Sequence, residues 1–197
     1  MHSNPEKIQH QRQVMQGVSL LTDVVGFTSL AERLPAGQLH TLMNRYYLKI
    51  SQIIQRHNGT IVNIVGDALL ALWTGLELNN ELKSSACEAA VDIIKSLNSS
   101  EFNDLKTCIG IHGGEISLGN LGADGHFEYA PVGDTINTTV RVEAYNRTLG
   151  TQILLTDAVA DILLFRTQYH GTVLFKGKTK AVGVYELLID EFDTTQN

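Results

Sequence analysis

The sequence has few cysteines, and it has no long apolar run. Its two cysteines, Cys87 and Cys108, are too few to staple a fold with disulfides and show no metal-binding spacing, so we expect reduced core thiols in a cytoplasmic protein. No apolar run reaches the length of a membrane span, and residues 1–16 are too polar for a signal peptide. We therefore expect no association with a membrane.

Positive charge is also in short supply. With 15 Lys and Arg against 21 Asp and Glu, the formal net charge is -6, which argues against a general nucleic-acid binder. A nucleotide remains possible, because metal ions and a few local cations can neutralise its phosphates. The 197 residues, 43% of them hydrophobic, suit one well-cored domain. We expect this domain over residues 17–189, with a flexible arm at 1–16 and a polar tail at 190–197.

Two aspartates stand out, because each lies at the end of an apolar run and close to a glycine. Asp23 ends the run at 18–24, and Asp67 follows the run at 60–65. Both runs are typical of buried strands. Two carboxylates that meet repel each other unless a cation lies between them, and oxygen ligands suit Mg²⁺ or Mn²⁺, and hence phosphate chemistry. From this pattern alone, ordinary turn residues after each strand explain the aspartates equally well.

The order of the expected elements is typical of an α+β, ferredoxin-like βαββαβ sheet with helices on one face and extra elements after it. In that order the first strand and the following hairpin are neighbours, so Asp23 and Asp67 can approach each other. The expected elements are a strand at 18–24, a helical region at 29–57 broken near 35–37, strands at 60–65 and 68–73, a helix at 81–97, a strand at 106–118, a glycine-rich hairpin turn at 119–125, a strand at 126–131, a helix at 134–149, a strand at 152–155, a helix at 157–164, and strands at 171–175 and 181–188.

Several motifs follow one another along nearly the whole chain. They are TDVVGFT at 22–28, VGDA at 65–68, GIHGGE at 110–115 with GNLG at 119–122, YAPVGDTINTTVR at 129–141 and FKGK at 175–178. With these motifs the chain resembles the class III nucleotidyl cyclases, whose catalytic domains make 3′,5′-cyclic nucleotides from nucleoside triphosphates. The resemblance implies the class III cyclase domain, with extra strands at the C-terminal end of the ferredoxin-like core.

The resemblance also implies a metal site. Asp23, Asp67 and the backbone carbonyl of Val24 would hold two divalent cations, Mn²⁺ or Mg²⁺. One ion would lower the pKa of the substrate's 3′-hydroxyl, and the other would anchor the β- and γ-phosphates.

Three further residues receive roles from the same resemblance. Asn137 would orient the ribose, Arg141 would stabilise charge on the α-phosphoryl group, and Lys176 would neutralise the leaving pyrophosphate. Asn137 and Arg141 lie one helical turn apart, which also suits an ordinary surface pair. The motif leaves open whether Lys176 or Lys178 contacts phosphate. In this family one protomer supplies the aspartates and the other the Asn and Arg, so a homodimer is implied.

The positions that read the base depart from the family pattern. Adenylate cyclases usually have Lys and then Asp or Thr there, and guanylate cyclases have Glu and Cys, whereas this chain has Asn63 and Ala130. Asn63 can both donate and accept, as uracil and cytosine require. The chain is in this respect similar to the bacterial pyrimidine cyclases of the Pycsar antiphage systems, whose cyclic UMP or cyclic CMP is read by a separate effector. Ala130 enlarges the pocket, so Tyr46 or Tyr47 would have to fill it.

Three functional hypotheses follow. The first is a homodimeric pyrimidine cyclase acting on UTP, with CTP only slightly behind. The second is an adenylate cyclase with non-standard base-reading residues. The third, weaker because the metal and transition-state positions are retained, is a catalytically inactive nucleotide-binding dimerisation module. His112 lacks a second histidine at ligand spacing, so we expect a core histidine there.

Overall fold

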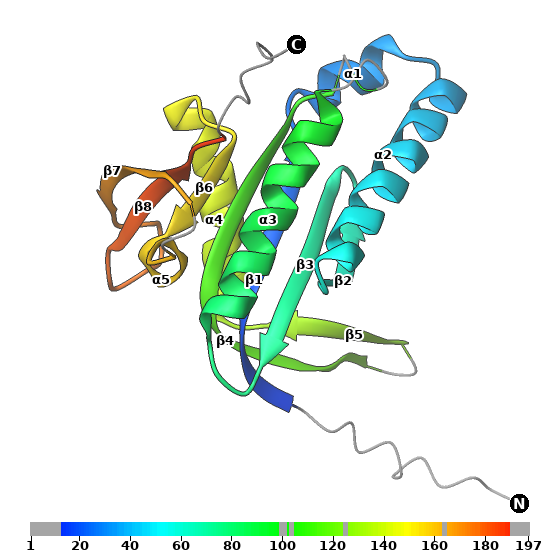
Figure 1. The fold of residues 1–197 in the computed structure, drawn as a ribbon. Helices are drawn as coiled ribbons and strands as arrows, with labels where there is room; N and C mark the ends of the chain where they lie inside the picture. The colour runs from blue at the N-terminus through cyan, green and yellow to red at the C-terminus, as the bar shows by residue number, and fades with distance from the viewer. Residues whose placement is uncertain (1–12, 99–101, 103–104, 124–125, 163–164, 190–197) are drawn as a thin grey trace, which may run out of the picture.

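The chain forms one mixed sheet with helices packed on it (Figure 1). The computed structural model describes residues 13–98, 102, 105–123, 126–162 and 165–189. The strands are β1 (Gln13–Val24), β2 (Thr60–Val65), β3 (Ala68–Gly75), β4 (Thr107–Ala123), β5 (His126–Val132), β6 (Ile153–Thr156), β7 (Thr167–Val173) and β8 (Val182–Leu187), and the helices are α1 (Phe27–Arg33), α2 (Ala36–Arg56), α3 (Asn80–Leu97), α4 (Asp134–Leu149) and α5 (Asp157–Ala160).

The strand order confirms the predicted α+β architecture. The sheet runs β2-β3-β1-β4-β6-β8-β7, and β5 pairs with β4 beside this path. The strands β2, β3, β1 and β4 pair antiparallel to their neighbours, which is the ferredoxin-like arrangement. β6 joins β4 in parallel, and β8 and β7 extend the sheet from there. The extra C-terminal strands therefore widen the same sheet.

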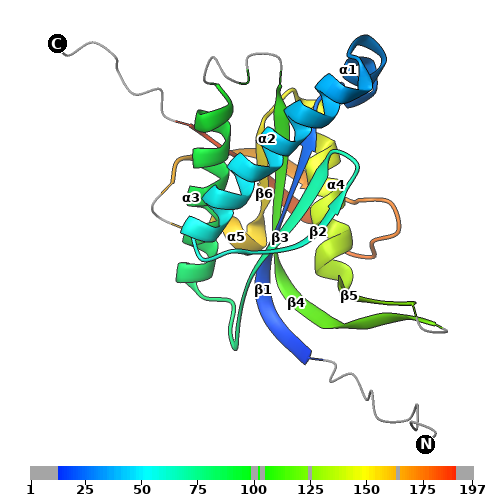
Figure 2. The same cartoon turned by 90° about the vertical axis from the view of Figure 1, so that its right-hand side faces the viewer.

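Helices cover both faces of the sheet, so the prediction of helices on one face is wrong. Figure 2 shows α2 and α3 on one side and α4 on the other. Ala71 and Trp73 of β3 belong to the core under α2 and α3, whereas Leu72 between them packs with Ile116 on the opposite face. Because side chains alternate along a strand, an apolar residue at each of these positions gives the sheet two faces that need cover. α4 covers the second face.

The predicted ends of the helices are confirmed where a residue breaks the helix. Pro35 lies between α1 and α2. Asn58, just after α2, has a φ of 61°, and Gly150, just after α4, has a φ of 71°. Both residues adopt the left-handed conformation that terminates helices and that Gly and Asn tolerate best.

Residues 119–123 of the expected glycine-rich turn form a strand instead, and 124–125 lie outside the described residues. β4 continues as a strand to Ala123, and Gly119 lies opposite Ala130 of β5. The backbone hydrogen bonds of this pairing outweigh the low strand propensity of glycine. β1 likewise begins at Gln13, earlier than expected, because it pairs with β4 as far as Leu118.

Other expected features concern the termini, the cysteines and a membrane span. Residues 1–12 of the expected arm and the expected tail at 190–197 lie outside the described residues. Cys87 and Cys108 are free and buried, as predicted, and burial raises the pKa of Cys87 to about 12. In the described part of the chain, no helix is long and apolar enough to cross a membrane.

His112 of β4 gives the fold a predictable sensitivity to acid. Its Nδ1 lies 2.7 Å from Oγ1 of Thr156, and burial, with a smaller effect of Lys178, lowers its pKa from 6.5 to about 4. At pH values above 6.5 the ring is neutral in both states. Below that, the unfolded chain binds the proton first, so the free energy of unfolding decreases as the pH falls towards 4.

We expect His112→Gln to remove much of this acid sensitivity. The wild type should lose up to about 3 kcal/mol between neutral and acidic pH from this group, and the variant should not. Urea unfolding followed by circular dichroism at several pH values measures the difference. An equal loss in both proteins would contradict the assignment to His112.

Candidate active site

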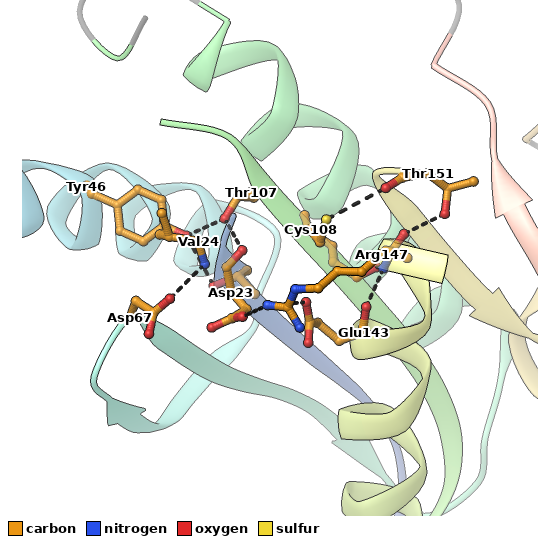
Figure 3. A network of polar contacts seen from close by, with 12 residues as sticks. Asp23, Val24, Tyr46, Asp67, Thr107, Cys108, Glu143, Arg147 and Thr151 are labelled. Carbon is orange, nitrogen blue, oxygen red and sulfur yellow. Dashed lines mark hydrogen bonds and ion pairs between the residues drawn. The ribbon is translucent and has the colours of Figure 1, made fainter. Parts of the chain in front are cut away.

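The two predicted aspartates meet at one end of the sheet (Figure 3). Asp23 is the second-last residue of β1, and Asp67 lies in the turn between β2 and β3. β1 and β3 are paired, with Thr22 opposite Leu69, which brings the turn to the end of β1. The backbone N–H of Val24 donates to Oδ2 of Asp67 at 3.3 Å and joins the two segments directly.

The electrostatics of this pair favour a bound cation. Burial, a hydrogen bond with Asp23 and repulsion from Asp23 raise the pKa of the Asp67 carboxyl above its ordinary 3.8. Both side chains are oxygen donors, which suits a hard divalent ion. Among the described residues there is no group of three or more His, Cys, Asp or Glu that could hold a metal. A metal ion here would therefore need Asp23, Asp67, the Val24 carbonyl and oxygens from water or substrate.

Two adjacent tyrosines of α2 make hydrogen bonds that hold the backbone at the aspartates. The hydroxyl of Tyr46 lies 2.6 Å from Oγ1 of Thr107, and Thr107 donates to the backbone oxygen of Asp23 at 2.9 Å. Tyr47 donates to the carbonyl of Gly66, next to Asp67. Tyr46 is fully buried, and burial raises its pKa to about 12. The structure thus places Tyr46 in the core, where it is linked through Thr107 to the backbone of Asp23.

Two charged residues of α4 complete this cluster and were missed in the sequence. The guanidinium of Arg147 pairs with the carboxylate of Asp23, and its Nη2 lies 4.0 Å from Oε1 of Glu143 (Figure 3). Glu143 is 4% exposed, and burial, with the negative charge of Asp23, raises its pKa from 4.5 to about 7. In the sequence, only the i, i+4 spacing of Glu143 and Arg147 could have pointed to them. Such a pair also occurs on ordinary helix surfaces, so the spacing does not indicate a functional site.

A close approach between α4 and β4 fixes where these side chains lie. A Cβ at Gly110 of β4 would come within 2.3 Å of the backbone nitrogen of Glu143, so only glycine fits there. Nδ2 of Asn146 donates to the carbonyl of Ile109 at 3.0 Å. These contacts lock the helix on the strand.

Asn137 and Arg141, predicted from the resemblance to contact ribose and the α-phosphoryl group, lie in the first half of α4. Asn137 is exposed, and Arg141 lies against the loop between β7 and β8, with Nη2 3.5 Å from the position of a Cβ at Gly177. Among the described contacts of Asp23 and Asp67, none comes from Asn137, Arg141 or Lys176. Within the described contacts of one chain, the two halves of the predicted site therefore do not touch each other.

The two lysines of the late motif have different surroundings. Lys178 donates to Oδ2 of Asp134, and this hydrogen bond holds the pKa of Asp134 below its ordinary value. Lys178 also donates to Oγ1 of Thr138 at 3.0 Å. Lys176 is exposed. Lys178 thus ties the loop to the first turns of α4, and the side chain of Lys176 can reach outwards.

The two predicted base-reading residues come from strands in contact with each other. Asn63 is exposed on β2, just after a change of register between Ile61 and Asn63. Ala130 is half-buried on β5, and β5 contacts β2. A bulge of this kind redirects a side chain.

Comparison with known proteins identifies the family. Residues 10–188 match the model of the adenylate and guanylate cyclase catalytic domain, so this chain belongs to that family. Cyclases of this family depend on divalent metal ions. Adenylate cyclase 1 of Rhizobium meliloti is 28% identical over 181 residues, which cover 86% of this chain and 27% of that protein. The chain thus spans about a quarter of the length of this curated relative.

Solved structures of cyclases share the fold. A bacterial light-regulated adenylyl cyclase superposes with a TM-score of 0.78 at 25% identity, covering 89% of this chain and 91% of that one. The adenylyl cyclase CyaB from P. aeruginosa superposes with a TM-score of 0.82 at 23% identity, covering 93% and 98%.

We expect Mn²⁺ to stabilise the protein through Asp23 and Asp67. At roughly a hundredfold excess over its Kd, the ion should raise Tm by about 5 °C or more, and a chelator should reverse this. Asp67→Asn should abolish the shift without lowering Tm in chelator, because it removes one of two repelling charges. Differential scanning calorimetry measures both effects. Glu77→Gln, at an exposed loop position, is the matched control, and a shift retained in Asp67→Asn would refute the site.

Proposed function

We propose that this chain is a metal-dependent nucleotidyl cyclase, which converts a nucleoside triphosphate into a 3′,5′-cyclic nucleotide and diphosphate. The observation that carries the proposal is the meeting of Asp23 and Asp67 at the end of β1 in a chain of the cyclase family. Two divalent ions, Mg²⁺ or Mn²⁺, would bind there with the Val24 carbonyl. When bound, they acidify the 3′-hydroxyl and neutralise phosphate charge.

The chain's own residues would position the substrate and stabilise charge. Asn137 would hold the ribose, so that the 3′-oxygen lies in line with the α-phosphorus. Arg141 would stabilise the negative charge that develops on the α-phosphoryl oxygens, and exposed Lys176 would receive the diphosphate. Lys178, tied to Asp134, would hold the loop that carries Lys176. Little covalent chemistry is required of the protein.

We propose a homodimer with two equivalent shared sites. Asn137 and Arg141 are on the side of α4 that makes no described contact with the chain's own aspartates, so they are available to a partner's. A closed two-fold assembly would then place each aspartate pair opposite the other protomer's Asn and Arg.

Mixing two inactive variants tests this sharing. Asp67→Asn and Arg141→Ala should each be inactive alone. After mixing in equal amounts and subunit exchange, half of the dimers combine the two variants and hold one intact site, so about a quarter of the wild-type activity should return. Product formation is measured by chromatography. No recovery despite exchange, shown with differently tagged chains, would contradict a shared site.

We propose a pyrimidine triphosphate, UTP ahead of CTP, as the substrate. Exposed Asn63 offers both a donor and an acceptor, and Ala130 has no polar group with which to select a purine amino group. The product would be a cyclic pyrimidine nucleotide that a separate effector binds, as in antiphage signalling. ATP is the second candidate, since the curated relative reported above is an adenylate cyclase.

Incubation with Mn²⁺ and each of ATP, GTP, CTP and UTP decides between them. We expect cyclic UMP as the main product, identified by mass. Asn63→Lys combined with Ala130→Asp should shift the ratio of ATP to UTP turnover upwards by about tenfold or more, because a Lys can donate to a ring acceptor of adenine and an Asp can accept from its amino group. Cyclic AMP from the wild type would select ATP. No product from any of the four would favour the inactive binding module.

A further inference from the structure

Arg147 holds a position that the proposed metal ion needs. Its guanidinium pairs with the Asp23 carboxylate, and 49% of its side chain is exposed. This inference about Arg147 rests on the proposed function, which places a divalent ion on the same carboxylate. A guanidinium and a divalent ion repel each other at this range, and the carboxylate oxygen that bonds Arg147 is lost to the metal. An ion that binds through Oδ2 of Asp23 therefore requires Arg147 to leave.

Glu143 offers the place to which Arg147 can move. It lies one turn earlier on α4, and its Oε1 is 4.0 Å from Nη2 of Arg147. In the part of the chain that the structure describes, this oxygen is buried and has no hydrogen-bond partner. A buried carboxylate oxygen without a partner is costly, so a small shift of the guanidinium would satisfy it.

The surroundings let the side chain move while the helix stays in place. Gly110 and Asn146 fix the backbone of α4 on β4, so the Cα atoms of Glu143 and Arg147 keep their positions. Arg147 also lines a cavity of about 580 Å³ with Lys106 and Thr107. Its side chain therefore has open space on one side and an acceptor on the other.

We propose that Arg147 is the built-in counter-ion of the metal site. Without metal, it neutralises the carboxylate of Asp23. When a divalent ion binds, Arg147 transfers from Asp23 to Glu143 and completes the hydrogen bonding of that buried carboxylate. The affinity for the first ion is then set by the exchange between these two partners.

A double-mutant cycle on Mn²⁺ binding tests the exchange. Free Mn²⁺ is measured by electron paramagnetic resonance on the full chain without nucleotide, for the wild type, Arg147→Gln, Glu143→Gln and the double variant. Arg56→Gln is the matched control, because Arg56 is exposed on α2 and lies 3.9 Å from Asp92 in a different cluster. Circular dichroism verifies that each variant is folded.

We expect Arg147→Gln to tighten Mn²⁺ binding about three- to tenfold, since the ion no longer displaces a guanidinium. Glu143→Gln should weaken binding about threefold in the wild type, because Arg147 loses its acceptor. The same change should have almost no effect in Arg147→Gln. Arg56→Gln should bind like the wild type. Independent effects of the two substitutions would overturn the exchange, since a general effect of charge acts equally in both backgrounds.

A second measurement needs no variant of Glu143. The Nε–Hε resonance of Arg147, assigned by its loss in Arg147→Gln, should shift when Mg²⁺ is added to the wild type and stay fixed in Asp67→Asn. A resonance that stays fixed while the ion binds would overturn the movement of Arg147 and leave the proposed function standing. Mn²⁺ binding that Asp67→Asn does not weaken would overturn the metal site and the proposed function with it.

Discussion

The repulsion between Asp23 and Asp67 is the interaction on which the rest of the site depends. Two carboxylates at the ends of adjoining segments cost free energy, and burial, together with the hydrogen bond and the repulsion from Asp23, raises the pKa of Asp67. The fold holds them there with contacts from three directions. Tyr46 and Tyr47 of α2 make hydrogen bonds to Thr107 and to the Gly66 carbonyl next to the aspartates. The Val24 N–H joins the end of β1 to Asp67, and Arg147 of α4 supplies positive charge. A site held in this way is prepared for a divalent cation.

α4 connects the two halves of the proposed chemistry. Its first half carries Asn137 and Arg141, which we assign to the partner's site, and its second half carries Glu143 and Arg147, which lie at the chain's own aspartates. The close contact at Gly110 makes the helix a rigid link between them. In the proposed dimer, one helix therefore takes part in both active sites.

Much of the architecture was predictable, because local rules and tertiary structure agree over most of the chain. The hairpin from β2 to β3, the break at Pro35 and the helix end at Gly150 follow from turn chemistry and periodicity. The prediction failed where pairing or packing overruled local preference. Glycine-rich residues 119–123 form a strand because β5 pairs with them, and α4 covers the second face because that face is apolar as well.

The sequence alone determined the order of helices and strands along the ferredoxin-like core, from it the expected meeting of Asp23 and Asp67, and, through ordered motifs, the resemblance to the cyclase family. Each of these follows from local pattern and from the order of the elements along the chain. Only the tertiary structure decided that Tyr46 supports Asp23, that Lys178 is tied to Asp134, and that Arg147 pairs with Asp23. These contacts join residues up to 124 positions apart. Their partners are set by how α2 and α4 pack on the sheet, and no spacing within a single segment records that packing.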